Sequence, residues 1–366
     1  MHYRGRILAS TFLLILLTSG AALAFPSQIP SPPPSTQGNP LPTVLPDTSG
    51  GSFPTPIQHV VVIVFENEEL STVKQYAPYL DYLAAHYGSA TNFYSTCHGS
   101  LPTYVAMTSG ETFGCENIGV RAADNIGELA TTHGLSWAGY LEAMPTASGC
   151  DKDSVSSYDI NHNAFLHYAD IVNNASMCDD HVLNSAAFNK SVAAGTLPAV
   201  SFYIPNIYDD GHTSLGGACK GDTSASDKPA CDPILTAQAD TWVKNFLTPI
   251  LNSTSPQVRA LVKTTAFMLA FDEGTTNAGY DFPGEANEHC TVMEGHSMTA
   301  CGGHVFFAVV SPYSLGLRYT VDATHYNIES TIEWLLGLPS DGGHDGTPQF
   351  PAMTCLFSFN SSSAST

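Results

Sequence analysis

Near-continuous apolar runs separated by helical patterns constrain the fold of this chain more than any other feature. Residues 57–65 (IQHVVVIVF), 264–271 (TTAFMLAF) and 305–310 (VFFAVV) have the length of strands and little polar alternation. Strands of that kind are buried on both faces, as in parallel sheets covered by helices. Weaker strand patterns lie at 135–140 and 199–204, and helical patterns at 76–87, 100–109, 124–133, 232–251 (with Asp232 as its cap) and 326–336. This order predicts an α/β fold, a three-layer sandwich with a mostly parallel central sheet.

Polar residues with the chemistry of metal ligands follow three of these strands. They are Glu66 and Asn67 after 57–65, Asp272 and Glu273 after 264–271, and the run Asn206, Asp209, Asp210 and His212 after 199–204. Parallel strands bring such residues together at the carboxyl edge of the sheet. Adjacent carboxylates repel each other, so a pair at the end of a buried strand favours a nearby cation. Oxygen donors predict a divalent metal ion, with calcium, magnesium, manganese or iron favoured over structural zinc.

Ser100 lies where one predicted helix begins, with Pro102 in the first turn. Free backbone N–H groups and the positive end of the helix dipole bind phosphate oxygens at such a position. With a metal lowering the pKa of its hydroxyl, a serine there can attack phosphorus. A plain N-cap serine is the alternative, and Thr96 and Thr103 are alternative nucleophiles.

Several histidines lie in polar loops between the predicted elements. His212 and His304 are favoured as contacts of a metal or a phosphoryl group, His325 less so. The remaining candidates, disfavoured as ligands, are His289, His296 and His344.

The N-terminal pattern predicts export. Residues 1–24 combine two arginines, a short apolar run and an Ala-Leu-Ala end, which indicates a signal peptide; an uncleaved anchor is the alternative. Residues 25–55 are rich in Pro and Ser and predict a disordered linker, 56–359 a single catalytic domain, and 360–366 a disordered tail. No later segment is long and apolar enough to span a membrane, so a secreted protein is expected.

The charge and the cysteine content are consistent with an exported protein. The chain has 33 Asp and Glu against 12 Lys and Arg, which argues against nucleic-acid binding because that depends on basic side chains. An exported chain with nine cysteines is expected to form disulfides. Pairing near neighbours gives 97–115, 150–178, 219–231 and 290–301 and leaves Cys355 over. Glycosylation sequons begin at Asn174, Asn189, Asn252 and Asn360.

Taken in order, a set of motifs resembles the phosphoesterase family that includes phospholipase C and acid phosphatases and is akin to alkaline phosphatase. The motifs are HVVVIVFEN at 59–67, HGSLPTY at 98–104, TSG at 108–110, PN at 205–206, DGH at 210–212, FDEG at 271–274, GHV at 303–305, SPY at 311–313 and THYNIESTIEWLLGLP at 324–339. Thr103 stands where the family usually has Asn, and Glu68-Glu69 replaces small or hydroxyl residues. Both departures affect the expected substrate preference more than the reaction class.

The resemblance implies an alkaline-phosphatase-like fold and a hydrolase of phosphoric esters with Ser100 as nucleophile. It implies four metal ligands, namely Glu66, Asn67, Asp272 and Glu273. It also implies that His212 and His304 contact the phosphoryl group or a metal.

These features predict a secreted acid phosphatase acting on a small phosphate ester or a phospholipid. The first alternative is a phospholipase C or other phosphodiesterase on the same fold, with apolar contacts to lipid from Phe93, Tyr94, Phe113 and Phe282. The second alternative is a non-catalytic surface or binding protein that keeps the scaffold.

Overall fold

The computed structural model describes residues 55–115, 118–221, 228–274, 302–343, 345–348 and 350–359. The predicted signal peptide, nearly all of the linker and the predicted tail lie outside these ranges. The same holds for Phe282, for His289, His296 and His344, and for the expected pair Cys290–Cys301.

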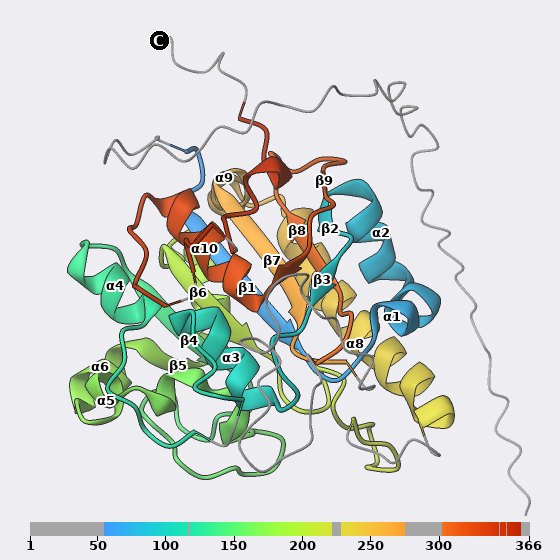
Figure 1. Ribbon diagram of the computed structural model, residues 1–366, viewed down its shortest axis with the longest axis horizontal. Coiled ribbons are helices and arrows are strands. Elements are labelled where there is room, and N and C mark those ends of the chain that lie inside the picture. Colours follow the sequence, from blue (N-terminus) through green and yellow to red (C-terminus); the bar gives the residue numbers. More distant parts are fainter. Residues whose placement is uncertain are drawn as a thin grey trace, which may run out of the picture. The chain divides into compact units, whose positions relative to one another are not determined.

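Within the described residues, eight strands form one sheet in the order β5-β4-β6-β1-β7-β8-β2-β9 (Figure 1). They are β1 (His59–Phe65), β2 (Gly88–Ala90), β4 (Trp137–Leu141), β5 (Val182–Asn184), β6 (Val200–Ile204), β7 (Thr265–Phe271), β8 (Phe307–Val310) and β9 (Arg318–Tyr319). A separate parallel pair joins β3 (Phe93–Tyr94) to β10 (Ala323–Thr324). The five strands β5, β4, β6, β1 and β7 are all parallel, whereas β8 is antiparallel to both of its neighbours. The predicted mostly parallel sheet is therefore confirmed.

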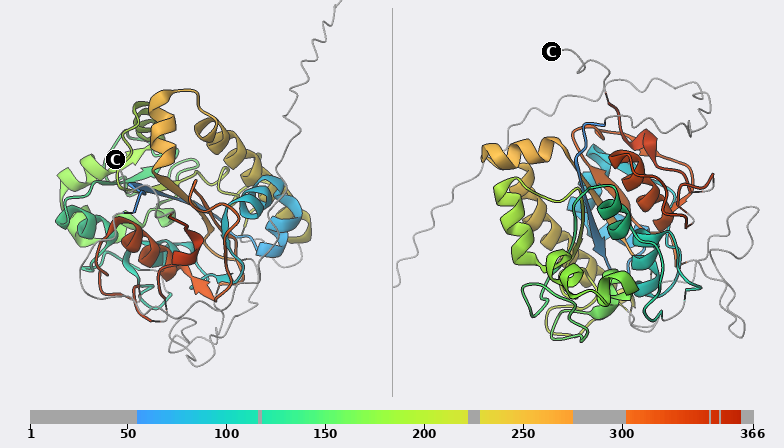
Figure 2. Two further views of the ribbon diagram at one scale, coloured as in Figure 1. Left: turned by 90° about the horizontal axis from the view of Figure 1, so that it is seen from above. Right: turned by 90° about the vertical axis from the view of Figure 1, so that its left-hand side faces the viewer.

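Helices cover both faces of the sheet, which confirms the predicted three layers (Figure 2). Those described are α1 (Leu70–Tyr76), α2 (Pro78–His86), α3 (Ser100–Ser109), α4 (Ile126–Thr132), α5 (Ala169–Val172), α6 (Ala175–His181), α7 (Ser185–Ala194), α8 (Lys228–Leu251), α9 (Pro256–Lys263) and α10 (His325–Leu336). Helices α3 and α10 pack together on one face, and α7, α8 and α9 cover the other. None of the described helices has the length and apolar character needed to cross a membrane.

The strands that carry the polar residues form the centre of the core. All seven residues of β7 and six of the seven in β1 are buried, which explains why neither sequence alternates. Their register pairs His59 with Thr265 and continues to Phe65 and Phe271. Both strands therefore end at the same level, and the residues that follow them are brought together.

Apart from α3, the predicted helices differ from the structure by up to four residues at their ends. The pattern at 76–87 corresponds to α2, which Pro78 begins, preceded by the separate α1. Helix α8 begins at Lys228, so Asp232, predicted as its cap, lies inside the helix.

Three of the four expected disulfides are present, namely Cys97–Cys115, Cys150–Cys178 and Cys219–Cys231. Cys355, the cysteine that the expected pairing left over, is free and exposed.

Candidate active site

Three adjacent parallel strands, β6, β1 and β7, deliver their following residues to one point at the carboxyl edge of the sheet. The amide of Asp272 donates to the carbonyl of Phe65 at 2.8 Å, continuing the β1–β7 ladder by one residue. The amide of Glu66 donates to the carbonyl of Asp210, in the loop after β6, at 3.0 Å. Backbone hydrogen bonds thus hold Glu66, Asp210 and Asp272 side by side.

These three carboxylates are completely buried. The ring of His162 lies between two of them, with Nε2 3.3 Å from Glu66 Oε1 and Nδ1 3.3 Å from Asp210 Oδ2. One donor atom from each of Glu66, His162 and Asp210 lies within 4.8 Å of the others. Among the described residues, no lysine or arginine forms an ion pair with any of these carboxylates.

Burial and mutual repulsion shift the pKa values of this cluster. Burial, followed by the charge of Asp210, raises the pKa of Glu66 well above its usual value. Burial, followed by the charge of Glu66, does the same to the pKa of Asp272. Burial alone would lower the pKa of His162, but the hydrogen bond and charge of Asp210 outweigh it and that pKa is raised. A positive charge beside these carboxylates would therefore strongly stabilise their ionised forms.

The donor atoms fit a divalent cation. Asp272 Oδ2 and Asn67 Oδ1 are buried, and no hydrogen-bond partner from the described residues reaches either atom. The backbone of Asn67 has a φ of +40° and donates its N–H to Asp272 Oδ1 at 3.0 Å, which keeps the two side chains together. Carboxylate and carboxamide oxygens with one imidazole are ligands that such ions accept. The residues that could hold the ion are thus Glu66, Asn67, Asp210, Asp272 and His162.

Ser100 is the first residue of α3, after Gly99, whose φ of +105° favours glycine. Its Oγ donates to Glu66 Oε2 at 2.9 Å, and the Tyr104 hydroxyl donates to Glu66 Oε1 at 2.8 Å. The side chain of Ser100 is half-buried, whereas Glu66 is not exposed at all. The hydroxyl therefore contacts the carboxylate cluster from the first turn of α3, whose backbone amides have no acceptor within a helix.

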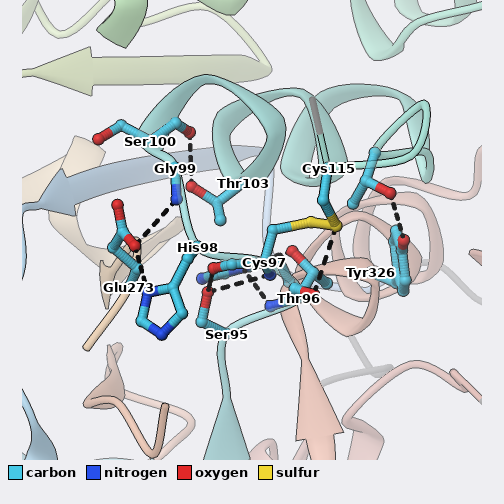
Figure 3. Close-up of a disulfide and its surroundings, with 12 residues drawn as sticks. Ser95, Thr96, Cys97, His98, Gly99, Ser100, Thr103, Cys115, Glu273 and Tyr326 are labelled. Carbon is cyan, nitrogen blue, oxygen red and sulfur yellow. Dashed lines mark hydrogen bonds and ion pairs between the residues drawn. A yellow bond between two sulfur atoms is a disulfide. The ribbon is translucent and has the colours of Figure 1, made fainter. Parts of the chain in front are cut away.

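Glu273 fixes the turn that leads into Ser100 (Figure 3). Its Oε2 accepts the amide of Gly99 at 2.9 Å and lies 2.6 Å from Nδ1 of His98. The Cys97–Cys115 disulfide fixes Cys97, the residue before His98. Glu273 thus connects the end of β7 to the start of α3.

The two other candidate nucleophiles lie differently. Thr103 is fully buried, and its hydroxyl donates to the carbonyl of Ser100 at 2.6 Å. Thr96 is also buried, with its hydroxyl 3.2 Å from Nδ1 of His325. Neither contact is with a carboxylate of the cluster.

The structure separates the three histidines favoured by the sequence. His212 lies beside the cluster, because its amide donates to Asp210 Oδ1 at 2.7 Å and its ring is 5.9 Å from that of His162. His325 is buried beside the end of β7, with Nε2 3.0 Å from the carbonyl of Phe271, and burial lowers its pKa to about 4. A neutral ring with Nε2–H donating to Phe271 fits this position, so His325 supports the strand end.

His304 is turned elsewhere. Its Nε2 lies 2.9 Å from the carbonyl of Thr91, and its ring stacks on Tyr94 with centroids 4.7 Å apart. None of its contacts within the described part of the chain is with the carboxylate cluster. Its predicted catalytic role stays a prediction.

Sequence reasoning missed His162, which ends the short 3-10 helix Ile160–His162. No strand end or spacing pattern marks this residue, because a long connection after β4 brings it to the site. Tyr104 was also missed as a partner of Glu66, although it lies one helical turn after Ser100 and so on the same side of α3.

A comparison of the whole chain with family models decides its identity. The model described as the Phosphoesterase family matches residues 71–339, most of the chain. The chain belongs to the Phosphoesterase family. Members of this family act on phosphoric esters, so the chain is a phosphoric ester hydrolase, as its motifs predicted.

Curated relatives of this phosphoesterase are phosphatases. It is 26% identical to the phosphatidylinositol-3-phosphatase of Mycobacterium tuberculosis over 82% of the chain and 83% of that protein. It is also 26% identical to a probable acid phosphatase of Kluyveromyces lactis and to a phosphate-repressible acid phosphatase of Penicillium chrysogenum. Those matches cover 83% and 70% of this chain but only 63% and 53% of the two fungal proteins.

Solved structures of similar fold include a protein of the alkaline-phosphatase superfamily. A superfamily protein from Vibrio parahaemolyticus aligns with a TM-score of 0.52 and 14% identity, over 85% of this chain and 73% of that one. The lipoteichoic acid synthase LtaP from Listeria monocytogenes aligns with a TM-score of 0.54 and 11% identity, over 83% and 76%. At these identities the likeness concerns the fold alone.

Proposed function

We propose that this phosphoesterase is a secreted, metal-assisted acid phosphatase that hydrolyses phosphoric monoesters through a phosphoryl group on Ser100. The observation that carries the proposal is the position of the Ser100 hydroxyl. Ser100 begins α3, and its hydroxyl donates to Glu66 inside a buried cluster of carboxylates. Among the described residues, no lysine or arginine forms an ion pair with this cluster.

In this mechanism the Ser100 proton passes to Glu66, whose Oε2 the hydroxyl already contacts at 2.9 Å. Ser100 Oγ attacks phosphorus, a new Oγ–P bond forms and the bond from phosphorus to the leaving oxygen breaks. The leaving alcohol takes a proton from His212. Water then attacks phosphorus on the opposite side from Oγ and gives a proton to His212, the Oγ–P bond breaks, Oγ takes back the proton from Glu66, and inorganic phosphate leaves. Amides of the first turn of α3 stabilise the negative charge of the phosphoryl oxygens.

A divalent cation would be held by Glu66, Asn67, Asp210, Asp272 and His162, with Glu273 orienting the turn beside it. When bound, it supplies positive charge for the phosphoryl oxygens and lowers the pKa of the Ser100 hydroxyl. The donor set favours calcium, magnesium, manganese or iron over structural zinc.

Export is part of the proposal. Three disulfides within the described residues support an oxidising compartment. The sequence pattern of residues 1–24 supports the same route. Fungal relatives named as acid phosphatases support an acid optimum.

A phosphodiesterase or phospholipase C remains the second candidate. Of the residues expected to provide an apolar surface for lipid, Phe93 is fully buried against Phe307, and Tyr94 stacks on His304. Phe113 is half-buried beneath the guanidinium of Arg121, 5.7 Å from its ring centroid. These three rings therefore offer little exposed surface to an acyl chain, which favours a monoester substrate.

Substrate class is tested by comparing p-nitrophenyl phosphate, p-nitrophenyl phosphorylcholine and a 3-phosphoinositide from acid to neutral pH. We expect monoester turnover highest at acid pH and abolished by EDTA, with restoration by a divalent ion. Preference for the choline ester would replace the proposal with the phosphodiesterase. Turnover of none of the three by metal-loaded protein would support the non-catalytic scaffold instead.

Replacing His162 by glutamine is expected to lower kcat/KM about 10- to 100-fold, the usual effect of disturbing a group that orients metal or substrate ligands. The imidazole contacts Glu66 and Asp210 at the same time, and one amide cannot reproduce both contacts. The control is His181→Gln, whose ring stacks on Trp137 and contacts its carbonyl away from the cluster. Equal rates for the two variants would remove His162 from the site.

A further inference from the structure

A second group of buried acidic residues lies at the end of α3 opposite to Ser100. Glu329 and Glu333 are one turn apart on α10, and Asp341 and Asp345 lie in the loop that follows. None of these residues has a role in the proposed hydrolysis. Their exposed fractions are 0% for Glu329, 3% for Glu333 and 1% for Asp345, whereas Asp341 is half-buried.

Three of these side chains point donor atoms at one another. One oxygen from each of Glu329, Asp341 and Asp345 lies within 4.8 Å of the others. Both carboxylate oxygens of Glu329 are buried with no hydrogen-bond partner, as are Asp341 Oδ2 and Asp345 Oδ1. Within the described ranges, no lysine, arginine or histidine forms an ion pair with them.

The remaining oxygens are fixed by the loop. Asp341 Oδ1 accepts the amide of Gly343 at 3.2 Å, and Asp345 Oδ2 accepts the Ser340 hydroxyl at 2.6 Å. Glu333 Oε1 accepts the amide of Asp341 at 3.0 Å. In each aspartate one oxygen thus accepts a hydrogen bond from the loop, while the other oxygen has no hydrogen-bond partner.

The loop also packs closely on the end of α3. A Cβ at Gly110, where φ is +61°, would lie 2.3 Å from Asp345 Oδ1, and a Cβ at Gly343 would lie 2.6 Å from the carbonyl of Ser109. Only glycine fits at either position. The carboxylates therefore lie against the negative end of the α3 dipole, which favours a cation and disfavours unbalanced negative charge.

We propose that Glu329, Asp341 and Asp345 bind a divalent cation of calcium's size, at a site separate from the active site. Calcium lies 2.3–2.6 Å from its oxygen ligands, so two ligands of one ion are at most about 5 Å apart, as these atoms are. The ion joins α10 to its following loop, which packs on the end of the helix that carries Ser100. Its role is to hold α3 in place, and the proposal does not depend on the proposed function.

The alternative to a cation is protonation. Without one, burial and then the charge of Asp345 raise the pKa of Glu333 to about 10. Burial and then the nearby carboxylate of Asp345 raise the pKa of Asp341 to about 7. Carboxyl groups that keep protons would need no ion, and metal binding separates the two cases.

Metal content of the full chain, stripped with EDTA and dialysed against calcium, tests the proposal. By elemental analysis we expect two ions per wild-type chain, one in Glu329→Gln, one in Asp272→Asn and none in the double variant. Asp345→Asn should also bind one ion, and it replaces Glu329→Gln if that variant does not fold. One ion in the wild type that Asp272→Asn loses and both cluster variants keep would overturn the second site alone.

Thermal unfolding gives an independent readout. Calcium at about 100 times its Kd should raise the wild-type Tm by roughly 5 °C, and Glu329→Gln should lose a distinct part of that rise. The control is Glu142→Gln, because Glu142 is a raised-pKa carboxylate whose oxygens accept from Asn206 and Tyr203. It should keep both ions and the full rise. A full calcium response in Glu329→Gln as well would contradict the proposal.

Discussion

Replacing Ser100 by alanine is expected to reduce monoester turnover on the order of 10³-fold or more, because the variant has no oxygen to receive the phosphoryl group. The fold should persist, since the Ser100 side chain is half-buried and its one described hydrogen bond is to Glu66. Steady-state rates with p-nitrophenyl phosphate, together with metal content and Tm, measure the effect. Bound metal should be retained, because Ser100 is not among the proposed ligands.

The matched control is Thr103→Val, which removes a hydroxyl from the same turn of α3 at almost constant volume. That hydroxyl donates only to the carbonyl of Ser100 within the described residues. We expect activity within a few-fold of wild type. If instead Thr103→Val is inactive and Ser100→Ala is active, the nucleophile has been assigned to the wrong residue.

Replacing Asp272 by asparagine is expected to abolish metal binding at the active site and to lower turnover at least about 100-fold, because a bound ion supplies several kcal/mol of charge stabilisation. The metal-free protein should become more stable. Asp272 Oδ1 accepts the amides of Asn67 and Glu273, and asparagine can keep that oxygen while removing a buried charge.

The pH dependence of that stability has a definite sign. Burial and the charge of Glu66 raise the pKa of Asp272 in the folded state above the unfolded value of 3.8. The folded state therefore binds more protons, and metal-free stability falls as pH rises from about 4 toward the raised pKa. Asp272→Asn should flatten this fall, and its metal-free Tm should exceed that of wild type by a few degrees at neutral pH.

Asp240→Asn is the control for this variant. Asp240 is also a buried aspartate that accepts backbone amides, those of Tyr79 and Leu80 at the start of α2. Burial raises the pKa of Asp240 as well, but the hydrogen bonds from Leu80 and Tyr79 and the charge of Lys244 oppose that shift, so its replacement should change the Tm little and leave metal content and turnover unchanged. A metal-free Asp272→Asn protein that is less stable than wild type would contradict the account of repelling carboxylates.

The sequence predicts this fold well where burial controls the pattern. The runs that became β1, β6 and β7 lie at the centre of the sheet, and residues there must be apolar on both faces. Helix α3 matches its predicted range, from Ser100 to the left-handed Gly110. Because these strands are parallel neighbours, the residues after them could be expected to meet. Antiparallel β8 could not be distinguished, since a fully buried strand has the same composition in either direction.

Other parts of the site depend on long connections that carry no periodic signal. His162 reaches the cluster from a loop, so no strand end marks it. His304 follows the expected motif, yet a hydrogen bond to the Thr91 carbonyl and stacking on Tyr94 turn its ring elsewhere. In the sequence Glu329 resembles an ordinary polar residue of an amphipathic helix, whereas in the structure it is fully buried. Side-chain direction in such places is decided by packing that only the structure shows.

The central claim, a phosphoryl group on Ser100, is tested most directly by rapid acid quench of the enzyme during turnover of a monoester, followed by mass spectrometry of its peptides. We expect one added phosphoryl group on the peptide that contains Ser100, at that residue, and none in Ser100→Ala. A phosphoryl group on another residue, or undiminished turnover in Ser100→Ala, would contradict the account.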